Sequence, residues 1–194
     1  MLENIDTFPP YCYPIDYKID RLKLTNSLDI LLQRLNIDNN YKYTINLTHI
    51  PGMIGDNRWR QYIDNHVELK KNNIDEVNFT ELLTEVKDLY IGQIIQEIYA
   101  QHNGNFQGRC QIAIMEPKSN FGRHVDKHTK SRYHIPLVTN KDCYWFFYKN
   151  KKFYKLHMPA DDKVWYFDPV NIEHDFHNVS DQYRWHLLLT SGKD

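Results

Sequence analysis

The chain has 194 residues, of which 25% are charged and 41% hydrophobic, and its formal net charge is -1. This length suffices for one domain with a buried core, and the composition is that of an ordinary globular protein. The balanced charge gives no electrostatic reason to expect a nucleic-acid partner. No apolar run approaches the length of a membrane span, so we expect no membrane partner either.

The chain start and the cysteines both bear on the compartment. Residues 1–6 lack the basic and apolar regions of a signal peptide. The three cysteines are odd in number and form no Cys-x-x-Cys pair. We therefore expect a cytoplasmic protein without a disulfide framework. The cysteines are Cys12, Cys110 and Cys143.

The first part of the chain predicts one helix and one strand. Residues 1–20 are rich in Pro, Tyr and Asp and indicate an irregular lead-in. Asn26 is a suitable N-cap for a short amphipathic helix that extends to Leu35. Residues 41–50 alternate in polarity and predict a strand, which Pro51 and Gly52 end.

A second helix is predicted after a stretch without a clear pattern. Residues 53–75 are polar with a few aromatic residues, and their pattern selects no element. The sequence from Asn78 to Glu81 matches a capping box, which would begin the longest helix. The helix would end near His102 and Gly104, where the glycine can adopt a positive φ. Its apolar residues recur at helical spacing: Leu82, Val86, Leu89, Tyr90, Ile94 and Ile98.

From about residue 108 the pattern changes to period two. Short strands at even spacing are typical of a sandwich, barrel or jelly roll. We therefore expect one domain over residues 1–194, with a helical or irregular part (1–107) packed on a β-rich core (108–194). Asn150 and Lys151 would form a tight hairpin turn. The predicted strands are 109–115, 131–139, 143–149, 152–158, 163–167 and 183–190.

A possible metal site lies in the β-rich part. His124 and Asp126 are two residues apart, so on an extended segment both side chains point to the same side. A third ligand has to come from a distant strand, and His174 is the best candidate, with His177 and His128 as competitors. Two imidazoles and one carboxylate that leave coordination positions open are the ligands of non-heme iron(II) oxygenases.

Two predicted strands carry Arg and His on one face. Arg184 and His186 alternate with bulky apolar residues, and Arg132 and His134 do the same. If these faces point into a roll, their charges need partners, because unpaired buried charges are costly. A bound dicarboxylate would pair them, since arginine binds a carboxylate through two parallel hydrogen bonds.

Residues 109–190 resemble the Fe(II)/2-oxoglutarate-dependent oxygenases of the aspartyl/asparaginyl β-hydroxylase-like family, which includes free-proline hydroxylases. Order, spacing and neighbouring residues all match, which makes the resemblance more specific than an isolated His-x-Asp. The matching segments are residues 113–117, 124–126, 132–137, 165–168, 173–174 with Asn178 and Ser180, and 184–187.

The resemblance implies a double-stranded β-helix and a set of site residues. His124, Asp126 and His174 would bind iron, and Arg184 would bind the far carboxylate of 2-oxoglutarate. Arg132 and His134 would line the co-substrate pocket and contact one of its carboxylates. Some members have Ser where this chain has Ala113, which cannot form a hydrogen bond. Gln111, on the same strand face, would replace that contact.

The implied function is that of a dioxygenase. With Fe(II), 2-oxoglutarate and O₂ it would hydroxylate an unactivated C–H bond of an amino acid or peptidyl side chain and release succinate and CO₂. A small or short substrate is mildly favoured, because the compact chain has no added peptide-binding repeat. The alternative from another class is a non-catalytic cupin-like module that binds metal or 2-oxoglutarate. A zinc hydrolase is disfavoured, because no general base is evident and the paired arginines would be unexplained. The sequence does not indicate the oligomeric state.

Overall fold

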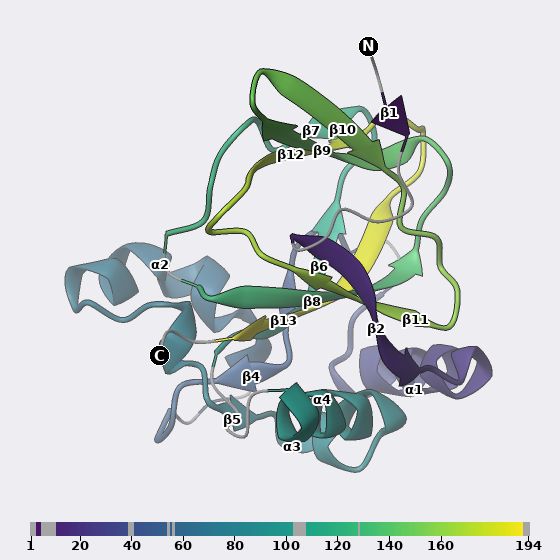
Figure 1. Cartoon of the computed structure of the whole chain (residues 1–194). Helices are drawn as coiled ribbons and strands as arrows, with labels where there is room; N and C mark the ends of the chain where they lie inside the picture. Colours follow the sequence, from purple (N-terminus) through teal and green to yellow (C-terminus); the bar gives the residue numbers. More distant parts are fainter. Residues whose placement is uncertain are drawn as a thin grey trace.

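A computed structural model describes residues 3–4, 11–38, 41–53, 55, 57–102, 108–127 and 129–191. Two β-sheets face each other, and helices cover the outer side of the larger one (Figure 1). This arrangement is that of a jelly roll, as predicted from the period-two pattern. In the described residues no helix is both long and apolar enough to span a bilayer.

The larger sheet supports the site. Its strand order is β2-β11-β8-β13-β6-β3, with antiparallel pairing throughout. Four of its strands correspond to strands predicted after residue 108, and β3 corresponds to part of the strand predicted over 41–50. The strands are β2 (Cys12–Lys18), β11 (Lys163–Phe167), β8 (Ser131–Val138), β13 (Arg184–Ser191), β6 (Cys110–Met115) and β3 (Ile45–Asn46).

The smaller sheet has the order β1-β10-β9-β12-β7. Asn150 and Lys151 have φ values of 52° and 64°. Two successive positive φ angles are those of a type I′ hairpin, which confirms the predicted turn between β9 and β10. The strands are β1 (Glu3–Asn4), β10 (Lys152–Leu156), β9 (Cys143–Lys149), β12 (Glu173–Asn178) and β7 (Ser119–Asn120).

Strand β13 separates two apolar cores. Trp185, Leu187 and Leu189 point away from the smaller sheet and pack with the helices in the larger core. Alternate residues of the same strand, Arg184 and His186, point to the space between the sheets. The period of two therefore places the polar residues inside the jelly roll. A second core of aromatic residues fills the rest of the space between the sheets: Trp145, Phe147, Trp165, Phe167 and Phe176.

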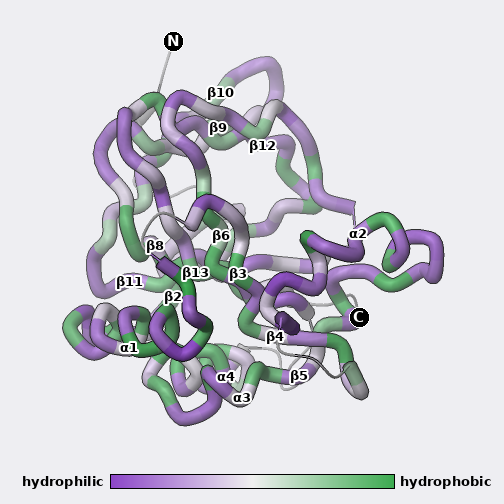
Figure 2. Tube along the Cα trace, turned by 180° about the vertical axis from the view of Figure 1, so that it is seen from behind, coloured by the Kyte–Doolittle hydropathy of each residue, from purple (hydrophilic) through white to green (hydrophobic). Residues whose placement is uncertain are grey.

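The helices close the larger core from outside. Hydrophobic and hydrophilic residues alternate along α1 (Figure 2), as expected for a helix with one buried side. One continuous core joins helix and strand residues. The helices and 3₁₀ turns are α1 (Arg21–Arg34), η1 (Arg58–Arg60), α2 (Gln61–Lys71), η2 (Glu76–Asn78), α3 (Thr84–Lys87) and α4 (Tyr90–His102).

The first helix begins earlier than predicted. Asp20, not Asn26, is the N-cap, and its side chain accepts a hydrogen bond from the backbone N–H of Lys23 at 3.1 Å. Leu24 is buried and extends the apolar face by one turn. Polar residues alternate with leucines over residues 21–26 and so concealed this start, and Leu22 is exposed.

The second helix is shorter than predicted and is interrupted. The capping box involves Asp75 as N-cap and Asn78 as the N3 residue of η2, so the prediction of a helix capped by Asn78 is wrong. A short strand, β5 (Glu81–Leu82), follows and pairs with β4 (Thr48–His49). Gly92 in α4 lies against the carbonyl oxygen of Val86, and any larger residue would overlap it. This close approach allows α3 and α4 to meet at an angle. The predicted Gly104 cap lies outside the described residues.

Three N-terminal and polar segments differ from expectation. Residues 12–18 form β2 rather than an irregular lead-in, and Pro14 is tolerated there because β2 is an edge strand. The predicted strand over 41–50 is divided into β3 and β4. Strand β12 was not predicted, because its sequence Glu-His-Asp-Phe-His-Asn has almost no apolar alternation.

Candidate metal centre

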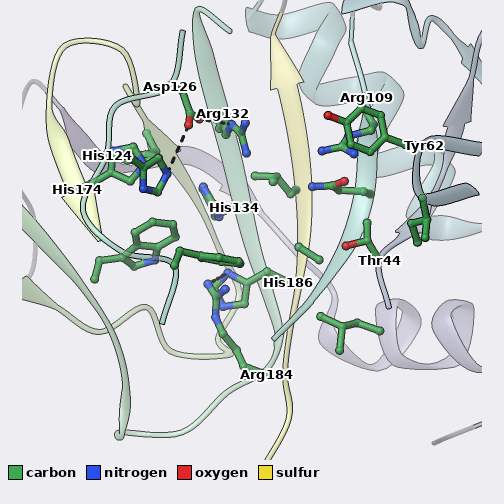
Figure 3. A pocket seen from close by; sticks show the side chains of 18 residues that line it. Thr44, Tyr62, Arg109, His124, Asp126, Arg132, His134, His174, Arg184 and His186 are labelled. Atoms are coloured by element: carbon green, nitrogen blue, oxygen red, sulfur yellow. Dashed lines mark hydrogen bonds and ion pairs between the residues drawn. The ribbon is translucent and has the colours of Figure 1, made fainter. Parts of the chain in front are cut away.

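The candidate metal centre joins two chain segments. His124 and Asp126 lie in the segment after β7, and His174 lies on β12. The backbone groups of His124 and His174 exchange two hydrogen bonds, with N–O distances of 2.9 and 2.8 Å. The backbone N–H of Asp126 donates to the carbonyl of Pro169 at 2.9 Å. One ligand atom from each of the three residues lies within 4.8 Å of the others (Figure 3).

The hydrogen bonds of the two imidazoles leave them ready to bind a metal. Nδ1 of His124 lies 2.6 Å from the carbonyl oxygen of Gly122, and Nδ1 of His174 lies 3.0 Å from that of Ile172. A carbonyl oxygen only accepts, so each Nδ1 carries the proton and each Nε2 keeps a free lone pair. Burial lowers the pKa of His174 to about 4, so this ring is neutral at physiological pH. Two imidazole nitrogens beside a carboxylate fit iron(II).

Arg132 connects the carboxylate of this centre to the N-terminal half of the chain. Its Nε lies 2.9 Å from Oδ2 of Asp126, and one Nη lies 3.2 Å from Oε2 of Glu76. The other oxygen of Glu76 accepts a hydrogen bond from Arg109. Alternating charges thus form a chain from the metal centre to η2, and this chain orients Asp126.

Arg184 lies at another end of the same space (Figure 3). Its guanidinium group stacks on the ring of Phe176 at 3.7 Å and donates a hydrogen bond to Nδ1 of His186. Among the described residues it has no carboxylate partner, and its Nε has no hydrogen-bond partner. Burial lowers the pKa of Arg184. Burying a guanidinium group without a counter-charge costs on the order of several kcal/mol of folding free energy. An anion bound at this end of the pocket would offset that cost.

Further polar atoms between Arg184 and the metal centre have no partner among the described residues. They are both ring nitrogens of His134, Nε2 of His186 and Oε1 of Gln111. Burial, followed by the nearby charge of Arg184, lowers the pKa of His134 and of His186 well below the usual value. Buried polar atoms are nearly always paired, so these atoms indicate a polar ligand.

These groups surround one cavity of about 480 Å³. Its size is within the range of small-molecule sites. Trp145 and Phe167 form its aromatic wall, and Ala113 lies beside Gln111 on β6. Thr44, Tyr62 and Ile63 come from the N-terminal half, which therefore shapes the opening.

The sequence profile of the family described as Aspartyl/Asparaginyl beta-hydroxylase matches residues 43–192. The chain belongs to this family. It is a 2-oxoglutarate-dependent hydroxylase, with iron(II), 2-oxoglutarate and O₂ as cofactor and co-substrates. No curated protein sequence matches the hydroxylase at a significant level.

Solved structures share the fold of this hydroxylase at low identity. A 2OG-Fe(II) oxygenase family oxidoreductase from Burkholderia pseudomallei is 16% identical, with a TM-score of 0.55, covering 94% of this chain and 84% of that one. A prolyl-4-hydroxylase from Pseudomonas putida is 9% identical, with a TM-score of 0.51 and coverage of 95% and 94%. A prolyl hydroxylase from Trichoplax adhaerens, in complex with a hypoxia inducible factor peptide fragment, is 13% identical, with a TM-score of 0.52 and coverage of 95% and 84%.

Of the two competing ligands, His177 does not join the cluster. His177 and His174 are three residues apart on β12 and so lie on opposite faces. Nε2 of His177 lies 2.7 Å from Oδ2 of Asp175, and its ring stacks on Tyr144 with centroids 5.8 Å apart. His128 lies outside the described residues.

All seven site residues named from the sequence line the cavity: His124, Asp126, His174, Arg184, Arg132, His134 and Gln111. Sequence reasoning missed Glu76, Tyr62 and Arg109. Arg109 carried a usable signal, because it is two residues before Gln111 and so belongs to the same strand face. Tyr62 carried none, since it lies in the stretch 53–75 whose pattern selects no element, and Glu76 directly follows that stretch.

Proposed function

We propose that this hydroxylase oxidises an unactivated C–H bond of an amino acid or peptidyl side chain and releases succinate and CO₂. The observation that carries the proposal is the combination of two sites in one cavity. Two imidazoles and a carboxylate converge at one end, and a buried arginine without a carboxylate partner lies at another.

In this proposal the role of each residue follows from its position in the cavity. His124, Asp126 and His174 would hold iron(II), and Arg184 would bind the far carboxylate of 2-oxoglutarate. When bound, the metal with 2-oxoglutarate and O₂ supplies the oxidising chemistry. The polypeptide orients these groups and excludes water.

The remaining polar residues would hold the co-substrate between those two ends. His134 and Gln111 each have an unpaired buried atom toward the cavity. Arg132 keeps one oxygen of Asp126 in place through its Nε and would contact a carboxylate of the co-substrate through its remaining N–H groups. Trp145 and Phe167 exclude water from this space.

We also propose how the sheets close, how many domains the chain forms and where the protein acts. The two sheets would close as a double-stranded β-helix, residues 1–194 would form one domain, and the protein would act in the cytoplasm. The substrate in this proposal is either a small molecule or a peptide.

The test is product formation. Purified protein with Fe(II), 2-oxoglutarate and O₂ is incubated with pools of free amino acids and of peptides, and succinate is quantified. We expect succinate above background from wild type with one pool, and none from His174→Ala. His177→Ala is the matched control, because it removes a histidine of the same strand outside the cluster. Equal succinate from wild type and His174→Ala would contradict the proposal.

A further inference from the structure

The side of the cavity formed by the N-terminal half has a cation that the proposed chemistry does not use. Arg109 is buried, with 8% of its surface exposed, and it lines the cavity. Its guanidinium group lies 3.9 Å above the ring of Tyr62 and donates to Glu76. Its Nε has no hydrogen-bond partner among the described residues. The group is thus held in place from two sides and retains an unused donor.

Arg109 lies far along the sheet from Arg184. Arg184 pairs with Met115, and Arg109 is six residues before Met115 on nearly extended chain. Six extended residues span about 20 Å. Arg132 reaches from the same level of the sheet to the metal-centre residue Asp126, whereas Arg109 contacts Tyr62 and Glu76. Figure 3 shows Arg109 with Tyr62 and Thr44 on one side of the cavity, well apart from Arg184.

The charges of the cavity leave one positive charge without a partner. Three guanidinium groups, of Arg109, Arg132 and Arg184, face two carboxylates, of Asp126 and Glu76. The two positive charges of iron(II) equal the two negative charges of 2-oxoglutarate, so a loaded site keeps the same excess. The imidazoles add no charge, because metal ligands are neutral and burial keeps the other rings neutral. An uncompensated charge in a buried site favours an anionic ligand.

A second hollow adjoins the cavity on the side of the Arg109–Glu76 ion pair. It has a volume of about 650 Å³, shares Tyr62, Asp126 and Arg132 with the main cavity and includes Glu76. The space around this ion pair therefore extends beyond the part of the cavity at Arg184.

We propose that Arg109 is a substrate-binding residue that recognises a carboxylate of the substrate, with the hydroxyl of Thr44 on the same side of the cavity. This inference rests on the proposed function, because it takes the remaining space of the cavity to be the substrate site. Tyr62 and Glu76 are positioning residues, since they act by holding the guanidinium group. The carboxylate belongs either to a free α-amino acid or to an acidic side chain of a peptide, and the test separates the two.

The experiment is calorimetric titration of the anaerobic protein loaded with Fe(II) and saturating 2-oxoglutarate. The first probe series is the free L-amino acids with their carboxamides. The second is N-acetylated, C-amidated Asp and Glu with the corresponding Asn and Gln compounds. We expect the acids of one series to bind at least about tenfold more tightly than their amides, because a hydrogen bond between two charged groups is stronger than one to a neutral group. Preference in the first series identifies an α-carboxylate, and preference in the second identifies a side-chain carboxylate.

Three variants test the role of Arg109. Arg109→Gln is expected to remove the preference for the acid. Glu76→Gln is expected to tighten acid binding several-fold, because it leaves the guanidinium group without its counter-charge. Arg109→Gln leaves Glu76 paired with Arg132 at 3.2 Å, so no buried carboxylate is left unpaired. Arg109→Gln combined with Glu76→Gln removes both members of the Arg109–Glu76 pair, and this double variant is expected to show no preference for the acid.

The outcomes distinguish this inference from the function on which it rests. If no acid of either series binds wild type more tightly than its amide, the inference is overturned. The same holds if the double variant keeps the wild-type preference. Both results leave 2-oxoglutarate binding intact, whereas a wild-type protein that fails to bind 2-oxoglutarate overturns the proposed function and this inference with it.

Discussion

His124 and His174 form a reciprocal pair: each backbone N–H donates to the other's carbonyl, at 2.9 and 2.8 Å. This pairing is an isolated antiparallel β-bridge, because His124 belongs to none of the named strands. It places the two rings 4.4 Å apart, with Asp126 two residues along the chain. The spacing of the metal ligands is therefore set by the backbone and does not depend on a bound ion.

The first prediction concerns Gly122, whose carbonyl accepts from Nδ1 of His124. Its φ of 74° is a left-handed conformation, and an added Cβ would meet no atom within 4 Å. In Gly122→Ala only the backbone is disturbed, at about 1–2 kcal/mol. Relief of that strain moves the Gly122 carbonyl away from Nδ1 of His124, so the imidazole is oriented less well. We therefore expect metal affinity to fall about 10-fold or more, as for other residues that orient a metal ligand.

Gly52→Ala is the matched control for this variant. Gly52 has a φ of 77° and open space around it, but it does not line the cavity. We expect a similar loss of stability and unchanged metal affinity in a competition titration with a chelator. A loss of affinity in both variants would show that general destabilisation, not the His124 contact, is responsible.

The second prediction concerns Arg184. Lysine keeps the charge but loses the planar pair of donors and the stacking on Phe176. We expect Arg184→Lys to weaken 2-oxoglutarate binding by about 10- to 100-fold, the range implied by 1.5–3 kcal/mol for a hydrogen bond to a charged group. Calorimetry measures the affinity. Arg123→Lys is the control, because Arg123 is an exposed arginine that pairs with Glu173, and it is expected to bind normally.

The third prediction concerns the junction between α3 and α4. A Cβ at Gly92 would overlap the carbonyl oxygen of Val86, which is backbone and cannot turn aside. We expect Gly92→Ala to lower the free energy of unfolding by about 1–3 kcal/mol, as overpacking does. Urea unfolding measures the change. Gln96→Ala, on the exposed side of the same helix, is expected to leave stability within about 0.5 kcal/mol.

The fourth prediction concerns the cysteines. Cys12, Cys110 and Cys143 are all buried and free. Burial raises the pKa of Cys110 to about 12, so its reactive thiolate is about a thousandfold scarcer at pH 8 than for an ordinary thiol. We expect a thiol reagent to label none of the three in the native protein at pH 8 and all three in guanidinium. Rapid native labelling would contradict the burial.

Much of the β-rich core and of the site could be predicted, because both depend on period-two alternation. That period placed Arg184 and His186 on the inner face of β13 and grouped Gln111 with the cavity. The N-terminal half was less predictable because its contacts are distant in sequence. Arg132 lies 56 residues from its partner Glu76, and no local pattern indicates such a pair. Strand β12 was missed for a related reason: its inward residue His174 is polar, so alternation of hydropathy is absent.

The most direct test of the central claim is optical. Anaerobic protein is mixed with Fe(II) and 2-oxoglutarate, and the visible metal-to-ligand charge-transfer band of the bidentate complex is recorded. We predict a band in wild type and in His177→Ala and no band in His174→Ala. Metal binding by wild type without the band, or an undiminished band in His174→Ala, would contradict the assignment of His124, Asp126 and His174 as an iron site that binds 2-oxoglutarate.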